Sequence, residues 1–215
     1  MSPLLALMRR EVALSFGGGG GLLAPLAFFT ATVVLAPLTL GPDLAQLRIL
    51  APTVLLVGLA LSTLLGLETQ WRHDDATGAL SQLCLGPLDL SVVAGVKIVA
   101  HWLAQGLALA VITPVYGIML GLPPAQSLTW AAIVAVCGLG FSAIGSLAAA
   151  LSVASRRPGV VMAILALPLY VPLAVFGAGV PERPGAWGLV VAITLMAVVL
   201  CPLGIAAALR ALDLS

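Results

Sequence analysis

Residues 98–155 read IVAHWLAQGLALAVITPVYGIMLGLPPAQSLTWAAIVAVCGLGFSAIGSLAAALSVAS and contain no formally charged side chain. Over the whole chain 61% of residues are hydrophobic and only 8% are charged, which is far outside the usage of soluble globular domains. The Gly, Pro and polar residues of 121–127 predict a turn that divides this apolar run into two membrane spans, near 92–120 and 128–151. The sequence therefore predicts an all-α integral membrane protein.

Four further apolar runs flank these two spans. They cover about 22–40, 49–67, 159–179 and 187–209. Each has the length needed to cross a hydrocarbon core of about 30 Å at about 1.5 Å per helical residue. The chain is thus predicted to form a single transmembrane domain of six helices over 1–215.

The N-terminal segment 1–16 is too short to span a membrane and mixes leucines with Arg9, Arg10 and Glu11. This pattern predicts an amphipathic helix that lies flat at the cytoplasmic surface. The unbroken glycine run 17–21 follows and predicts a hinge between this flat helix and the first upright one. Glu11 follows the two arginines, and the apolar run beyond is too long and continuous for the hydrophobic region of a cleaved signal peptide, so we expect the N-terminus to be retained.

The distribution of basic residues predicts the orientation of the six spans. With the N-terminus inside, seven of the nine Lys and Arg residues fall on the inner side, leaving only Arg48 and Arg183 outside. Both termini, the loop 68–91 and the loop with Arg156 and Arg157 are therefore expected in the cytoplasm.

The loop 68–91, ETQWRHDDATGALSQLCLGPLDLS, is the long polar interruption of the chain. Asp74, Asp75 and Thr77 are residue types that cap helices, and leucines 80, 83 and 85 provide an apolar face. Gly86-Pro87 is expected to end this helix before the third span begins. We expect an ordered surface helix that meets a partner in water.

Small residues recur every four positions in the third and fourth spans. They are Ala100, Ala104 and Ala108, and Gly138, Ser142, Ser146 and Ala150. Such stripes let helices approach closely in lipid, and we favour contacts within one chain over contacts between two. Prolines 114, 168, 172 and 202 fall inside spans, where we favour tolerated kinks over a pair of helices that bends during transport.

The chain lacks the residues of several function classes. Its eight acidic side chains lie outside the predicted spans, which disfavours a transporter driven by protons or sodium. The single lysine, Lys97, follows Val96 and not glycine, so a Walker A nucleotide site is excluded. The three cysteines are far apart in the sequence, which argues against a set of structural disulfides. A net charge of +1 gives no basic surface of the kind that binds nucleic acid. Energy for any work must come from another subunit.

The two histidines suggest no catalytic or metal site. His73 lies beside two aspartates, and a solvated helix start explains it better than a metal site. His101 lies one turn after Lys97 and beside Trp102, near the predicted inner interface. A haem ligand is conceivable there, but a hydrogen-bonded or interfacial histidine is favoured.

The polar loop and the start of the third span carry a recognisable signature. It comprises WRHDDATGALSQL at 71–83, GPL at 86–88 and KIVAHWL at 97–103, together with Arg9-Arg10-Glu11, the glycine hinge and the six-span plan. The chain resembles the haem exporter protein B (CcmB-type) family, the permease subunits of the cytochrome c maturation export system. It departs from the family at Thr77 and Ser81, where members typically carry acids.

This resemblance implies a membrane subunit of the type-2 ABC exporter kind, expected as a homodimer in the bacterial inner membrane with a separate ATP-binding subunit. Further partners would be other cytochrome c maturation membrane proteins and a periplasmic haem chaperone. Haem is a candidate substrate, ATP would be bound by the partner, and no firmly bound cofactor is expected. The resemblance implies an ATPase-coupling helix formed by Trp71, Arg72, Asp74, Asp75, Gly78, Leu80, Gln82 and Leu83, and an interface motif of Lys97, His101 and Trp102.

Two other functions stay open at this point. The chain would suit an ABC permease for another substrate such as a lipid or a drug, or a haem-handling membrane scaffold that transports nothing. Within the family function, the subunit would either move haem itself or use ATP to release the loaded chaperone.

Overall fold

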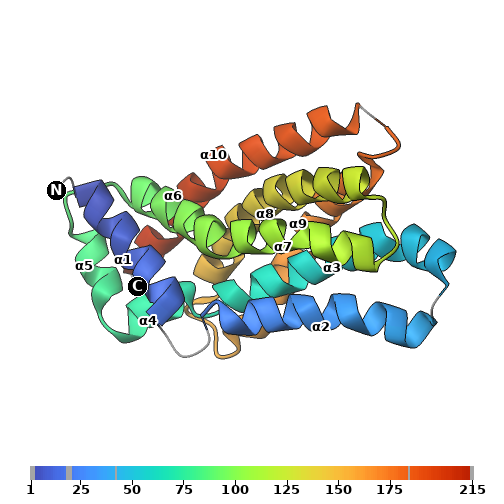
Figure 1. The fold of residues 1–215 in the computed structure, drawn as a ribbon. Coiled ribbons are helices and arrows are strands. Elements are labelled where there is room, and N and C mark those ends of the chain that lie inside the picture. The colour runs from blue at the N-terminus through green and yellow to red at the C-terminus, as the bar shows by residue number, and fades with distance from the viewer. Residues whose placement is uncertain (1–2, 18–20, 42, 184, 214–215) are drawn as a thin grey trace.

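The computed structural model describes residues 3–17, 21–41, 43–183 and 185–213, and every regular element in these ranges is a helix. The elements are α1 (Pro3–Gly17), α2 (Leu23–Leu40), α3 (Leu44–Leu67), α4 (Gln70–Ala76), α5 (Ala79–Cys84), α6 (Leu90–His101), a π-helical turn η1 (Trp102–Gly106), α7 (Leu107–Met119), α8 (Pro124–Ser152), α9 (Pro158–Gly179) and α10 (Ala186–Asp213). Figure 1 shows them as an elongated bundle with α1, α4 and α5 gathered at one end.

Six of the helical stretches are long and apolar enough to cross a membrane, as the sequence predicted. Two spans begin four or five residues earlier than predicted, for local reasons. The carboxylate of Asp43 accepts hydrogen bonds from the amides of Ala45 and Gln46 and so starts α3 at Leu44. Pro124 starts α8, because proline in the first turn of a helix removes no hydrogen bond.

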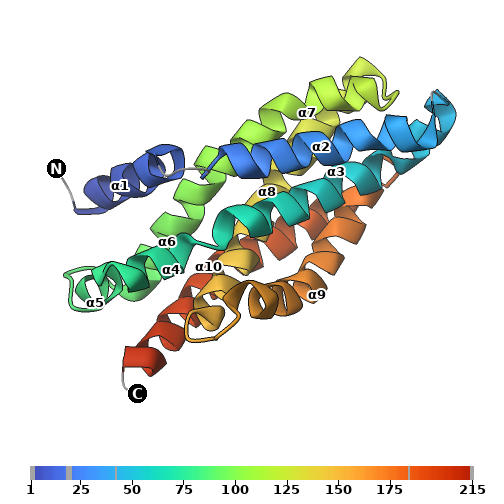
Figure 2. The ribbon, with the colours of Figure 1, turned by 90° about the horizontal axis from the view of Figure 1, so that it is seen from below.

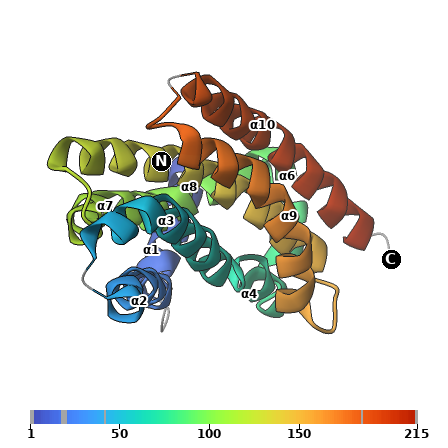
Figure 3. The ribbon, with the colours of Figure 1, turned by 90° about the vertical axis from the view of Figure 1, so that its right-hand side faces the viewer.

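Helix α8 lies at the centre of the bundle and contacts α3, α7, α9 and α10 (Figure 3). Its small residues make this position possible, since Ser142 and Ser146 are buried against neighbouring helices of the same chain. The preference for contacts within one chain is confirmed for these two serines. Helices α2 and α9 bury one face each, with Phe29 and Tyr170 in the core, and expose apolar side chains such as Leu38 and Ile164 on the other, where lipid would surround them.

The third span contains a wide π-helical turn, η1, between α6 and α7. In this turn Gly106 lies against the indole of Trp102, where a Cβ would approach Trp102 Cδ1 to 2.5 Å. Trp102 Nε1 donates a hydrogen bond of 2.8 Å to the carbonyl of Ala135 in α8. The turn therefore directs Trp102 toward the central helix. The prolines predicted inside spans lie inside α7, α9 and α10 and do not end them.

The N-terminal segment forms the predicted helix, α1. Gly17, expected in the glycine hinge, belongs to α1 instead, because helix α1 continues one residue beyond the predicted segment. The central part of the hinge, 18–20, lies outside the described residues.

The loop 68–91 differs from the prediction of one helix over Trp71–Leu83. It contains two short helices, α4 and α5, separated at Gly78, which adopts a φ of 71°. A positive φ is favourable for glycine and strained for most other residues. At Gly78 the chain therefore leaves the helical conformation of α4 and turns into α5. Figure 2 shows α4 following the end of α3 while α5 lies at the outer end of the molecule.

Candidate functional site

Four charged side chains form a closed cluster between α1, α4 and α6. Lys97 Nζ lies 2.7 Å from Glu11 Oε2 and 2.6 Å from Asp74 Oδ2. Arg10 completes the cluster, with 2.7 Å to Glu11 Oε1 and 2.8 Å to Asp74 Oδ1. Two cations thus face two carboxylates, and each carboxylate contacts both cations.

Burial makes this cluster sensitive to the loss of any one charge. The Lys97 and Asp74 side chains are each 1% exposed, and that of Glu11 is 8% exposed. Removing one partner of such a buried set leaves an uncompensated charge in a poorly solvated place, which costs about 3–5 kcal/mol. Arg10 is partly solvated; burial lowers its pKa, but the hydrogen bonds and charges of Asp74 and Glu11 outweigh this and raise it above the ordinary value.

Helix α4 is further anchored through Trp71 and Gln70. The Trp71 ring centre lies 5.0 Å from Lys97 Nζ, within the range of a cation–π interaction. Trp71 Nε1 donates to Ser146 Oγ at 3.1 Å, and Ser146 Oγ donates to Gln70 Oε1 at 2.8 Å. Gln70 Nε2 donates to the Lys97 carbonyl at 3.2 Å. These bonds connect α4 to α8 and α6.

The residues predicted for the ATPase-coupling helix divide into two groups. Arg72, Asp75, Gly78 and Gln82 are exposed. Trp71 and Asp74 are buried, and their side chains are occupied in the charge cluster and its hydrogen bonds. They hold α4 in place and expose almost no surface themselves, while the assignment of the eight residues to an ATPase-coupling helix stays a prediction.

The predicted caps and the apolar face of the loop also need correction. Asp74 caps nothing, because both carboxylate oxygens pair with cations. Thr77 ends α4 and begins no helix, with Oγ1 donating to the His73 carbonyl at 2.7 Å. Leu80 and Leu83 are half-buried, whereas Leu85 is 88% exposed. The apolar face is thus partly covered by the protein itself.

The interface motif lies in the third span, with Lys97 and His101 in α6 and Trp102 at the start of η1. Lys97 and His101 are buried and Trp102 is half-buried. His101 Nδ1 lies 3.0 Å from Ser142 Oγ of α8, which confirms the interpretation of a hydrogen-bonded histidine. Beyond it, Gln105 of the π-helical turn is also buried.

Sequence reasoning missed the partners of Lys97. Arg10 and Glu11 were interpreted only as the polar face of an interfacial helix, and Gln70 was not considered. One signal was present: Glu11 and Lys97 are opposite charges that each border a long apolar stretch. A charge in that position must reach water or a partner.

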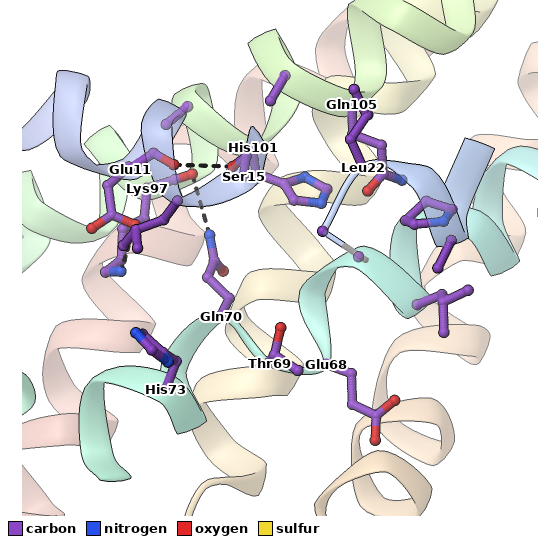
Figure 4. Close-up of a pocket in the computed structure, with 18 of the residues that line it drawn as sticks. Glu11, Ser15, Leu22, Glu68, Thr69, Gln70, His73, Lys97, His101 and Gln105 are labelled. Atoms are coloured by element: carbon purple, nitrogen blue, oxygen red, sulfur yellow. Dashed lines mark hydrogen bonds and ion pairs between the residues drawn. The ribbon is translucent and has the colours of Figure 1, made fainter. Parts of the chain in front are cut away.

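Among the described residues no three His, Cys, Asp or Glu side chains come close enough together to hold a metal ion. His73 is exposed and lies among the side chains that line the pocket drawn in Figure 4. The site consists of paired charges and hydrogen bonds that hold α1, α4, α6 and α8 in fixed positions relative to one another.

Comparisons with known proteins cover nearly the full chain. Residues 2–212 match the family model described as CcmB protein. The chain is 39% identical to heme exporter protein B of Paracoccus denitrificans, over 95% of this chain and 97% of that protein. It is 35% identical to heme exporter protein B of Bradyrhizobium diazoefficiens, over 98% of each chain, and 36% identical to that of Haemophilus influenzae, over 96% of each chain. The chain therefore belongs to the CcmB family.

Proposed function

We propose that this protein is the membrane subunit of an ABC exporter for cytochrome c maturation, working with a separate ATP-binding subunit. Three observations support the proposal. The relatives carry the name heme exporter protein B, the chain has six apolar helices of spanning length, and its sequence has no Walker A motif. Haem export, or release of a haem-loaded periplasmic chaperone, would then be powered by ATP that the partner binds.

The main structural support for this proposal is that one part of the polar loop is buried and another part is exposed. Helix α4 is anchored by Asp74 and Trp71, while Arg72, Asp75 and Gln82 are exposed beside these anchors. The count of basic residues predicts that this loop faces the cytoplasm. Its exposed face is therefore the surface that we assign to the ATP-binding subunit.

The charge cluster gives this surface a mechanical connection to the membrane helices. A displacement of α4 by the ATPase would act on α6 through the 2.6 Å contact between Asp74 and Lys97. It would act on α1 through Arg10, which contacts Asp74 at 2.8 Å. Buried charge pairs resist separation, so α1, α4 and α6 are expected to move together.

The assembly in which this occurs is part of the proposal. We infer a homodimer in the bacterial inner membrane, with both termini in the cytoplasm. The other cytochrome c maturation membrane proteins and the periplasmic haem chaperone would act on the outer side.

A matched pair of charge reversals tests the proposal. Asp75→Lys changes an exposed acid on the assigned surface, and Glu182→Lys makes the same change at an exposed acid in the turn between α9 and α10. We expect Asp75→Lys to lower recovery of the ATP-binding subunit with a tagged chain and to lower c-type cytochrome levels. Glu182→Lys should leave both unchanged.

The same purification separates the alternatives. Recovery of an ABC-type ATPase together with cytochrome c maturation proteins is the expected result. An ATPase recovered from a strain whose c-type cytochromes do not require this chain would indicate a permease for another substrate. Recovery of the chain with haem and without any ATPase would overturn the proposal in favour of a haem-handling scaffold.

A further inference from the structure

A cavity of about 480 Å³ lies directly above the charge cluster, enclosed by α1, the start of α2, the end of α3, α4 and the third span. Figure 4 shows His101 and Gln105 among the side chains that line it. A volume of this size falls within the range of small-molecule pockets.

Two buried nitrogen atoms in the wall of this cavity have no hydrogen-bond partner among the described residues. They are His101 Nε2 and Gln105 Nε2, on side chains whose residues are 8% and 3% exposed. A buried polar group without a partner costs about 1–3 kcal/mol. Two such groups lining one cavity indicate a ligand that supplies the missing acceptors.

The neighbouring hydrogen bonds define what these atoms offer. The carboxamide Nε2 of Gln105 can only donate. His101 Nε2 carries its proton when Nδ1 accepts from Ser142 Oγ, 3.0 Å away. Gly66 of α3 faces both side chains, and a Cβ at Gly66 would lie 2.9 Å from His101 Nε2. Glycine at this position therefore lets the side chains of His101 and Gln105 lie directly against α3.

The charges around the cavity favour a ligand whose hydrogen-bond acceptor carries no charge. Lys97 is already shared between two carboxylates at 2.7 and 2.6 Å. A buried phosphate or ionised carboxylate would need a free cation, and none of the cavity-lining residues supplies one. The two neutral donors instead match a carbonyl oxygen.

The depth of the cavity and its apolar wall identify the class of molecule. His101 lies one helical turn further into the third span than Lys97. We take the charge cluster as the level of the lipid headgroups, which places His101 at the level of the ester carbonyls of phospholipids. Leu14 and Leu65 line the cavity and are 40% and 41% exposed, so acyl chains can continue over them toward the bilayer. We propose that this cavity binds the ester region of a diacyl glycerophospholipid, with His101 and Gln105 donating to its carbonyls.

This proposal does not depend on the proposed function, because the purified chain alone suffices to test it. The probes are a diester phosphatidylethanolamine and its diether analogue, which has the same headgroup and chains but no carbonyls. In native mass spectrometry we expect the wild-type chain to retain one diester lipid, at least about fivefold in preference to the diether.

Matched variants assign the effect to the two donors. His101→Leu and Gln105→Leu are each expected to lower diester occupancy about tenfold and to remove the preference over the diether. Gln126→Leu makes the same change at an exposed glutamine in α8 and should retain both. Thermal unfolding of each variant identifies any that fail to fold. The comparison of the two lipids uses the wild-type chain, so it does not depend on whether the variants fold.

Two results would overturn the proposal. One is equal retention of the diester and diether lipids by the wild-type chain. The other is displacement of the diester lipid by added haem whose Soret absorbance is lost in His101→Leu, which would assign the cavity to haem.

Discussion

The helices α4 and α5 lie next to each other in the same polar loop, yet the protein uses them differently. Helix α4 contributes Trp71 and Asp74 to the buried interior, where both have partners in other helices. In α5 no described side chain is fully buried. Polar residues in this loop therefore have two roles. Some of their charges hold helices together, and others are exposed and free to contact a partner.

The largest expected effect comes from removing the cation that α4 and α1 share. Lys97→Met leaves Glu11 and Asp74 with Arg10 alone and should lower the free energy of unfolding by about 3–5 kcal/mol. Equilibrium unfolding in detergent micelles measures this loss. Arg72→Met removes an exposed cation of the same helix and should stay within about 0.5 kcal/mol of wild type. Equal effects of the two changes would refute a buried role for Lys97.

A smaller effect is expected from neutralising the carboxylate on α4. Asp74→Asn keeps the shape and leaves the buried Lys97 paired with Glu11, so the excess positive charge falls on Arg10, which is partly solvated. The loss is therefore mainly that of charged hydrogen bonds and should be about 1.5–3 kcal/mol, less than for Lys97→Met. Asp75→Asn, at the neighbouring exposed position, is the control and should cost little.

A double-mutant cycle sharpens this comparison. Combined with Lys97→Met, Asp74→Asn should cost less than alone, because the unpaired carboxylate is removed along with its cation. Additive costs for the two substitutions would show that Asp74 and Lys97 do not interact in solution.

Removing one hydrogen bond from α4 should have a more modest effect. Trp71→Phe deletes the indole N–H that donates to Ser146 Oγ at 3.1 Å and should cost about 1 kcal/mol. In a Ser146→Ala background the same change should cost less, since the acceptor is already absent. An unchanged cost in that background would mean that Trp71 contributes through packing alone.

The smallest effect is expected for the surface ion pair that follows α5. Arg210 and Asp89 approach only to 3.9 Å and their side chains are 63% and 78% exposed. Solvent screens such a pair, so Arg210→Ala should change the free energy of unfolding by less than about 0.5 kcal/mol. A loss comparable to that of Lys97→Met would remove the distinction between buried and surface charge.

Much of the fold could be predicted from the sequence because hydrophobic length is a local property. The spans follow from uninterrupted apolar runs. The starts of α3 and α8 were predicted too late, because Asp43 and Pro124 begin these helices before the apolar runs do. The charge cluster could not be predicted in this way. It joins Glu11 and Asp74 to Lys97 across three helices, and nothing local in the sequence indicates which charge a folded chain brings to which other.

The candidate docking residues illustrate the same limit. The family resemblance implies one coupling helix over Trp71 through Leu83, but Gly78 adopts a positive φ and divides it. Sequence alone also gave no reason to separate Asp74 from Asp75, since the two acids are adjacent and chemically identical. Burial of one and exposure of the other come from the position of α4 against α6.

Amide hydrogen exchange across the polar loop, measured with and without the ATP-binding subunit, tests the central distinction most directly. We expect the amides of α4 to be protected in the chain alone, and those of α5 to exchange rapidly there and slow on binding of the partner. Equal exchange of α4 and α5 in the chain alone, or an α5 that the partner leaves unprotected, would contradict the account.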